Sequence, residues 1–426
     1  SVTLDTDFFE DATSSSQAFK SANIAPFNFA THKFLSSTNV SYMFEAAQGT
    51  VDVDMSNWDL SGVTAFTDMF KSAGGTTVLG DITFPQSTAL SPSASFSMRT
   101  MFYYAKAGDI TIGNFDSSNC TNIGYMFYVA QYDSLDADSL DLTNVTDTDN
   151  AFALCGRTGT TDSWDFSSHD VSSVQTCSSM FNQAYLKELN VSGLDFSAST
   201  NSHSMFKNIR ELTTFTCSGL KVGGNCNSIF DTFQLTTVDT STIDFSAATS
   251  LQSAFSYAKI TTVALNFGAS CTNIYRMLYR STVEELDLSG CNTTGITNMQ
   301  GLCREAYGIK TVTLDNGYGV ASGCNARLLF YNCPNLESVT INTFDTTNCT
   351  DLAFFLYWSS NSGSGLTVDL ANLKTDNATD LYGVAGNAYK LGGSHDLSSL
   401  DTSSSTNMSS MFSSNDITSL DVGNFD

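Results

Sequence analysis

A short pattern built around Met-Phe, or a close substitute, recurs along the whole chain of 426 residues. When the Phe of each copy is taken as the reference residue, successive references lie about 26 residues apart on average. Internal repeats of this length are typical of solenoids, in which each coil contacts only its neighbours. The repeat therefore predicts stacked coils in place of separate globular domains. The reference residues are Phe19, Phe44, Phe70, Phe102, Phe127, Phe152, Phe181, Phe206, Phe230, Phe255, Leu278, Cys303, Phe330, Leu356, Ala385 and Phe412.

Each copy of the repeat has the same three parts. An alternating apolar run such as "TVDVDM" or "SVTINTF" predicts a short strand. A polar turn rich in Ser, Asn, Asp and Gly follows it. The spacing of apolar residues then changes to i, i+3, i+4 and i+7, as in Ile123, Met126, Phe127 and Ala130. This spacing is that of an apolar stripe on a helix of two or three turns, so we expect a strand, a turn and a short helix in every coil.

The Met-Phe pair itself is expected to lie in the core. A helix this short is unstable alone in water, and it persists only by burying its apolar face against the coils on either side. We therefore expect one solenoid domain over residues 1–426, an α/β solenoid of about 16 coils of about 26 residues each. Longer intervals predict insertions near residues 78–97, 156–166 and 359–366, and the last unit is incomplete at the C-terminus.

The charge of the chain restricts its partners. It has 43 acidic and 18 basic residues, a formal net charge of −25. Such a surface repels nucleic acid and anionic lipid headgroups, so we expect no nucleic-acid partner. No apolar run is long enough to cross a membrane, and we expect no membrane insertion in this segment. Phosphate-binding loops, dinucleotide-binding loops and hydrolase motifs are missing as well, so we expect no enzyme and no cofactor.

Aspartate recurs eleven residues before the reference residue, in half of the repeats. In-phase carboxylates one coil apart repel each other, and two arrangements would relieve the repulsion. Each Asp side chain can accept backbone N–H bonds in the turn that follows it. Alternatively, Ca²⁺ can bridge neighbouring carboxylates, although the glycine-rich repeat of calcium-binding β-rolls is missing. The candidates for calcium come from four successive repeats: Asp116, Asp141, Asp170 and Asp195.

The eleven cysteines also follow the repeat. Five of them replace apolar residues of the expected core and are interpreted as small buried hydrophobic side chains: Cys155, Cys177, Cys226, Cys303 and Cys333. Cys324 and Cys349 belong to neighbouring repeats at nearly the same phase, and they are the candidate disulfide. No Cys-x-x-Cys occurs, which disfavours zinc.

Asn-x-Ser/Thr sequons make N-glycosylation a further possibility, although the repeat places Asn beside Ser or Thr for capping reasons alone. Half of the sequons share one phase, eight residues before the reference, in an expected exposed turn: Asn119, Asn144, Asn348 and Asn377. The others are Asn39, Asn190, Asn292 and Asn407.

Segments such as "LDLSGCNTTGITNMQGL" and "SLDTSSSTNMSSMF" resemble the BspA-type leucine-rich repeat, also called the mycoplasma-lipoprotein-type surface repeat. The resemblance spans the whole chain and is most specific in the half of the repeat that contains Met-Phe. It implies a right-handed leucine-rich solenoid on secreted or surface proteins, which are usually adhesins, matrix binders or parts of surface structures. It implies no catalytic activity and does not fix a ligand.

These observations predict a non-enzymatic extracellular or cell-surface protein with a structural or adhesive role. Neither end has a visible polar capping repeat, so we expect either a segment of a longer protein or end-to-end self-association into a filament. Other surface proteins, matrix proteins and glycans are the further partners expected. The alternative is a recognition module for a specific protein or glycan, with exposed aromatics near Phe84 to Phe96 or Trp164 to His169.

Overall fold

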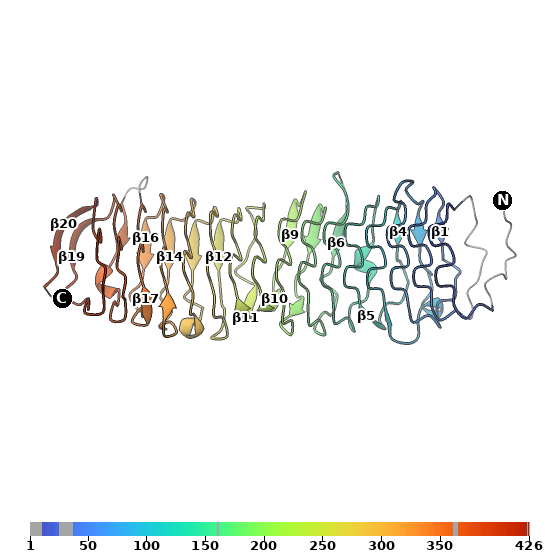
Figure 1. Ribbon diagram of the computed structural model, residues 1–426, viewed down its shortest axis with the longest axis horizontal. Coiled ribbons are helices and arrows are strands. Elements are labelled where there is room, and N and C mark those ends of the chain that lie inside the picture. Colours follow the sequence, from blue (N-terminus) through green and yellow to red (C-terminus); the bar gives the residue numbers. More distant parts are fainter. Residues whose placement is uncertain (1–10, 25–36, 160–161, 361–364, 424, 426) are drawn as a thin grey trace. The chain divides into compact units, whose positions relative to one another are not determined.

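The computed structural model describes residues 11–24, 37–159, 162–360, 365–423 and 425. The chain divides into two compact units. The first comprises Ser1–Asn201 and Met205–Thr216, and the second comprises Ser202–Ser204 and Cys217–Asp426. Within each unit, successive coils pair through short parallel strands, so each unit is a parallel β-solenoid (Figure 1). The solenoid predicted from the repeat is confirmed.

The strands of the first unit stack on two sides of the coils. One side carries two three-stranded sheets, of order β1-β2-β4 and β6-β7-β9. The other side carries the pair β3-β5, which comes just before the Met-Phe segment in the sequence. All of these pairings are parallel. The strands are β1 (Val53–Asp54), β2 (Ile82–Thr83), β3 (Phe96–Ser97), β4 (Ile110–Thr111), β5 (Cys120–Asn122), β6 (Ser163–Asp165), β7 (Glu188–Asn190), β8 (Asp195–Phe196) and β9 (Thr214–Thr216).

The second unit contains a longer ladder, the five-stranded sheet β12-β13-β14-β16-β18, together with the pairs β10-β11, β15-β17 and β19-β20. Its central register aligns Leu286 with Val312 and Val312 with Val339, all of them buried. The strands are β10 (Lys221–Asn225), β11 (Asp244–Ser250), β12 (Thr262–Ala264), β13 (Glu285–Asp287), β14 (Thr311–Thr313), β15 (Cys324–Asn325), β16 (Ser338–Thr340), β17 (Cys349–Asp351), β18 (Thr367–Val368), β19 (Gly392–Asp396) and β20 (Asp416–Asp421).

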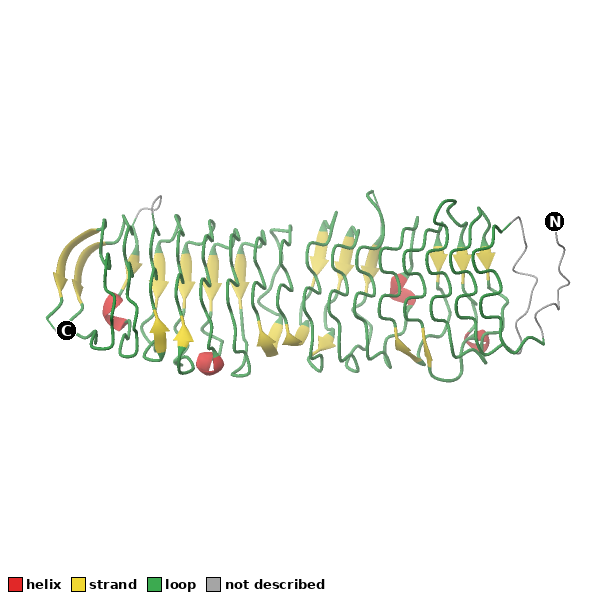
Figure 2. Cartoon of the chain, viewed as in Figure 1, coloured by secondary structure: helices red, strands yellow, loops and turns green. Residues whose placement is uncertain are grey.

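The prediction of a helix in every coil, and with it the α/β leucine-rich repeat class, is wrong. Turns and loops connect the strands of each coil, and Figure 2 shows only scattered helical segments. Over the described residues, these segments are four 3₁₀ turns of three residues each. They are η2 (Thr88–Leu90), η3 (Ala137–Ser139), η4 (Thr293–Gly295) and η5 (Leu370–Asn372).

A chain of linked turns replaces the expected helix at Met-Phe. In one coil, every second backbone N–H bonds the carbonyl three residues earlier, and the N–H groups between them bond the next coil. The bonds within the coil are Met126 to Ile123, Tyr128 to Tyr125 and Ala130 to Phe127, at 2.9–3.2 Å. The bonds to the next coil are Tyr125 to Asp149, Phe127 to Ala151 and Val129 to Ala153, at 2.7–3.0 Å. Every N–H of the segment is therefore satisfied without a helix.

The linked turns require a left-handed backbone at two fixed positions. Tyr125 has φ 57° and Val129 has φ 58°, and the corresponding residues of other coils behave in the same way. A residue with positive φ at the third position of a turn is the feature of a type II turn. Glycine takes this position in some coils, as Gly301 (φ 62°) and Gly383 (φ 57°). Because these turns close between residues three apart, they place the same residues on one side as a helix would.

The reference phenylalanines form a continuous stack in the core of the first unit. Adjacent rings are 5.0–5.8 Å apart between centroids and are nearly parallel, an offset stack that follows the spacing of the coils. From Phe44 to Phe206 these side chains are fully buried. In the second unit, Phe230 and Phe255 stack at 5.5 Å, and the reference positions through Ala385 are buried. The core role predicted for the Met-Phe positions is confirmed.

Candidate functional site

The aspartates that recur eleven residues before the reference form turns with their own backbone. Their Oδ1 atoms accept the backbone N–H two residues later at 2.9–3.0 Å, which is an Asx turn. The hydroxyl of Ser172, followed by its backbone N–H, holds the pKa of Asp170 below its ordinary value. The turn-forming arrangement that the sequence offered is therefore present. All four calcium candidates are bonded in this way: Asp116, Asp141, Asp170 and Asp195.

Two of the calcium candidates line one shallow hollow of the first unit. Asp141 and Asp170 border it together with Asp138 and His169. The hydrogen bonds from Ser172 have the largest effect on the pKa of Asp170 and lower it, while burial and the negative charge of Asp195 partly oppose that lowering. Among the described residues, no group of three or more His, Cys, Asp or Glu side chains is arranged to hold a metal ion. The bridging calcium stays a prediction.

A second row of polar side chains lies five residues before the reference and joins neighbouring coils. Asn122 accepts the backbone N–H of Gly124 at 2.8 Å, and its amide donates to Asp147 of the next coil at 3.0 Å. Arg99, on the coil that precedes that of Asn122, pairs with the same Asp147 carboxylate at 2.8 Å. This row therefore ties three coils together through hydrogen bonds and charge.

All eleven cysteine side chains are buried. The core role predicted for Cys155, Cys177, Cys226, Cys303 and Cys333 is confirmed. Burial raises the pKa of the Cys155 and Cys333 thiols to about 12, so neither is a thiolate nucleophile at neutral pH.

The candidate disulfide partners are brought directly together. Cys324 in β15 and Cys349 in β17 occupy paired positions of adjacent parallel strands. Strand neighbours lie about 4.8 Å apart, within the range of Cα separations that a disulfide spans. Both side chains are thiols in the structure, and the hydrogen bond to Cys324, followed by burial, raises the pKa of Cys349 well above its ordinary value. The disulfide stays a prediction.

The sequons differ in their exposure. Asn144 and Asn377 are exposed, whereas the side chains of the other six are partly covered. All four Asn eight residues before the reference donate their amide to a carbonyl of the preceding coil, at 2.8–3.4 Å. A glycan would have least obstruction at the two exposed positions. Partly covered are Asn39, Asn119, Asn190, Asn292, Asn348 and Asn407.

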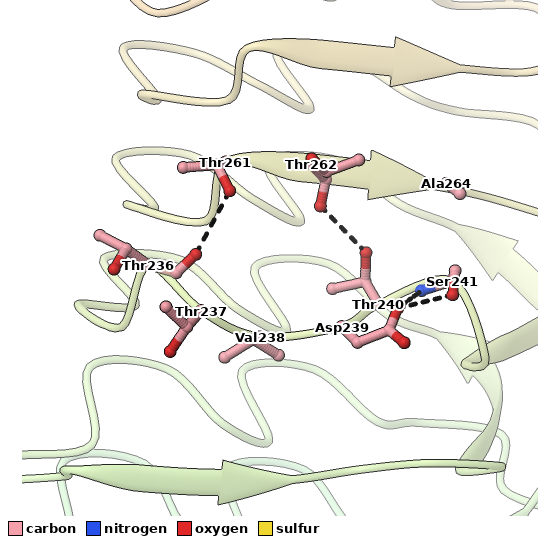
Figure 3. A pocket seen from close by; sticks show the side chains of 9 residues that line it. All are labelled: Thr236, Thr237, Val238, Asp239, Thr240, Ser241, Thr261, Thr262 and Ala264. Carbon is pink, nitrogen blue, oxygen red and sulfur yellow. Dashed lines mark hydrogen bonds between the residues drawn. The ribbon is translucent and has the colours of Figure 1, made fainter.

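A hollow on the second unit is lined mostly by threonine hydroxyls (Figure 3). It holds about 320 Å³ beside β12, and hydrogen bonds from Thr261 to Thr236 and from Thr240 to Thr262 join its walls at 3.3–3.4 Å. Its one titratable group is Asp239, whose pKa the Ser241 hydroxyl, followed by the Ser241 N–H, lowers below the ordinary value. A carboxylate that stays ionised in this way is a hydrogen-bond acceptor and not a proton donor near neutral pH.

The exposed aromatics lie elsewhere than predicted. Phe84, Phe96 and Trp164 are buried, so the places predicted from the insertions are wrong. Exposed rings gather instead on the outer side of the Met-Phe turns in both units. Tyr104 of the first unit is 46% exposed and lies in a cluster with Tyr103 and Tyr128, and Tyr257 and Trp358 of the second unit are 44% and 42% exposed. These positions were not among those singled out from the sequence. The signal that could have found them is the concentration of Tyr, Trp and Arg in "IYRMLYR" and "FFLYW".

One family model matches residues 5–83, 96–218 and 316–425, and its description is "Mycoplasma protein of unknown function, DUF285". The chain belongs to this family. The matched segments cover more than half of the chain and reach into both compact units. Comparison with curated proteins and with solved structures gives no match.

The DUF285 membership agrees with a repeat protein and assigns no chemistry. It does not carry the finer resemblance to BspA-type leucine-rich repeats, because the coils show no helix of that class over the residues that the structure describes. Of the helical segments that the structure describes, none has the length and apolar character needed to cross a bilayer.

Proposed function

We propose that this chain is a non-enzymatic structural or adhesive solenoid that acts outside the cell, as part of a surface layer or filament. The observation that carries the proposal is that the recurring aspartate and cysteine side chains have structural roles. The recurring aspartates are engaged in their own turns, and the cysteines are buried beside the stacked core. Groups that repeat at structural positions build a surface of constant chemistry, which suits scaffolding and multivalent contact.

The extracellular location rests on the sequence resemblance to BspA-type surface proteins and on the surface chemistry. A net charge of −25 keeps such a chain soluble and apart from anionic lipid. Parallel coils present strand edges wherever a stack ends, and a strand edge is a template for pairing with another chain. Pairing of this kind between copies would give a filament through a heterologous contact.

Immunogold labelling of the source cells tests the location. Antibody raised against the purified chain is expected to label intact cells as strongly as permeabilised cells. An antibody to a cytosolic enzyme should label only the permeabilised cells and serves as the control. Label that requires permeabilisation would contradict the proposal. Negative-stain microscopy of the native material then separates fibres from single particles.

The second candidate function is a recognition module for a specific partner. The exposed rings and arginines of the second unit favour it, since Tyr, Trp and Arg are the residues that dominate binding hot spots. The two functions are compatible, because an adhesive scaffold needs a contact surface.

A further inference from the structure

The outer side of the Met-Phe turns in the second unit carries two groups of aromatic rings on successive coils. Tyr257 contacts Tyr279 at 5.4 Å between centroids, on the next coil. Farther along, Tyr331 contacts Tyr357 at 6.1 Å and Trp358 at 5.7 Å. We call these rings, together with Phe354, the aromatic flank. Its members are Tyr257, Tyr279, Tyr331, Phe354, Tyr357 and Trp358.

Arginines bridge the gap between the two ends of the aromatic flank. The guanidinium of Arg276 stands 5.0 Å from the Tyr279 ring, and that of Arg304 stands 5.8 Å from Tyr279 and 5.5 Å from Tyr331. Cation–π contacts at these distances hold both kinds of side chain in place. The row is therefore uninterrupted from the coil of Tyr257 to the coil of Trp358.

A buried carboxylate fixes the arginines further. Glu305 accepts Arg280 Nε at 2.7 Å and Arg304 Nε at 3.1 Å, and the Tyr307 hydroxyl lies 3.4 Å from it. Burial is the largest single effect on the pKa of Glu305 and raises it, but the hydrogen bonds and charges of Arg280 and Arg304 together bring the pKa below its ordinary value. Because the bonds use Nε, the terminal guanidinium N–H groups can meet an acceptor on a ligand. The flank thus offers aromatic surface and oriented hydrogen-bond donors together.

Charge limits what can bind here. Arg280 and Arg304 face one carboxylate, that of Glu305, and Arg276 stands over the Tyr275 and Tyr279 rings. Arg327 is paired with Asp351 and Asp380 at 3.4 and 3.1 Å. Four cations against three anions leave little net charge on this side of a chain whose total is −25. The whole protein repels a polyanion, and a polycation would be drawn to the exposed aspartate rows instead. A ligand that selects this flank must therefore use the rings, and a neutral ligand is not repelled by the charge of the rest of the chain.

The size and shape of the flank favour a polymer strand over a folded protein. A stable protein–protein interface buries roughly 800 Å² on each partner. Six rings that each expose less than half of their surface offer on the order of 400 Å². Since the rings follow one another from coil to coil, an extended ligand with repeating units can contact them in sequence. Pyranose rings supply the required chemistry, because their C–H faces pack on aromatic rings and their hydroxyls accept from guanidinium groups.

We propose that the aromatic flank of the second unit is a binding site for a neutral linear polysaccharide. It rests on the proposed function, because a chain outside the cell would meet the neutral polysaccharides of walls and matrices. Trp358, Tyr279 and Tyr331 supply the stacking surface, and Arg280 and Arg304 supply the donors to sugar hydroxyls.

Affinity electrophoresis of the full chain in gels containing hydroxyethylcellulose, xyloglucan, laminarin or mannan tests the site, with dextran sulfate as the charged comparison. At least one neutral polymer is expected to retard the chain. Trp358→Ala and Tyr279→Ala should each weaken that retardation at least tenfold. Tyr318→Ala, which removes a ring equally exposed but outside the flank, should leave it unchanged. Trp358→Phe keeps a ring in place and should retain most of the binding if Trp358→Ala lowers stability, which thermal unfolding reports.

Several outcomes would overturn the site. These are no retardation by any neutral polymer, retardation by dextran sulfate alone, equal retardation of Trp358→Ala, or binding to a gelatin or fibrinogen column in place of sugars. Label on intact cells together with such a result would leave the proposed function standing and remove only the sugar site.

Discussion

An aspartate and the Ser or Thr two residues later form the unit that recurs most often on the surface. At Asp401, Oδ1 accepts the Ser403 backbone N–H at 2.9 Å and the Ser403 hydroxyl at 2.6 Å. These bonds stabilise the ionised carboxylate and lower its pKa. Since the folded-state pKa is depressed, the resulting stability is complete above the unfolded value of about 3.9 and is lost as pH falls through the folded pKa.

Replacing Ser403 with Ala tests the residue-scale account. The hydroxyl is the larger cause of the lowered pKa, so Ser403→Ala should raise the pKa of Asp401 part of the way to its ordinary value, with the backbone bond retained. The pKa is measured by NMR titration of the Asp401 carboxyl carbon. Ser404→Ala is the matched control, because the Ser404 hydroxyl bonds the Asp376 carbonyl instead. An unchanged pKa in Ser403→Ala would count against the assigned cause.

The element that distinguishes this fold from a helical repeat is the chain of linked turns. Alternate N–H groups leave the coil to bond the next one, so the element forms only where a neighbouring coil is present. Left-handed non-glycine residues cost about 1–2 kcal/mol relative to glycine, and the coil-to-coil bonds must offset that cost. This explains why the segment is short and why it repeats with so little variation in length.

A pair of glycine substitutions separates linked turns from a helix. Ala46 has φ 53°, whereas Ala47, next to it, does not have a positive φ. Ala46→Gly should leave the free energy of unfolding unchanged or raise it by up to about 1 kcal/mol, since glycine takes a left-handed backbone without strain. Ala47→Gly should lower it by about 1 kcal/mol. In a helix both substitutions would destabilise, so equal losses in urea denaturation would refute the turns.

The paired strands β15 and β17 allow a direct count of cysteine thiols. Buried thiols do not react with iodoacetamide in the folded protein, and denaturation exposes all of them. If Cys324 and Cys349 form the predicted disulfide, protein purified under oxidising conditions should take up nine alkyl groups on denaturation without reductant, two fewer than the eleven cysteines. Intact mass reports the number. Cys324→Ser should then give ten, because Cys349 has lost its partner and all ten remaining thiols react, and uptake of eleven by the wild type would exclude the bond.

At the scale of the whole molecule, stability is carried by contacts between neighbouring coils within each unit. Such a chain approximates a sum of coil and interface free energies. The stacked phenylalanines of the first unit are a common part of those interfaces. Because each ring has a neighbour on either side, the loss of one removes two stacking contacts.

Phe127→Ala tests this interdependence. Phe127 is fully buried between Phe102 and Phe152, so we expect a loss of about 3–5 kcal/mol in the free energy of unfolding. Hydrogen exchange should rise first in the coils that carry these three residues. Val78→Ala, at a site 48% exposed, should change stability by about 0.5 kcal/mol or less. Exchange that rises uniformly through the first unit would argue for one cooperative core instead.

The sequence alone determined the period of the repeat and the buried positions within it, and it offered the Asx turn as one of two roles for the recurring aspartates. These follow from local chemistry: apolar residues recur at fixed spacing, and Asp two residues before a Ser or Thr N–H closes a turn wherever the backbone allows. Gly301 and Gly383 lie within the segments expected to be helical, and glycine in a helix interior is unfavourable, so they were a local sign against a helix.

Tertiary structure alone decided between helix and linked turns, because both close between residues three or four apart and bury the same side chains. The choice depends on where the remaining N–H groups bond, and their acceptors lie about 25 residues away on another coil. The aromatic flank has the same origin. Tyr257, Tyr331 and Trp358 are far apart in sequence, and only the stacking of coils brings their rings and the intervening arginines into one surface.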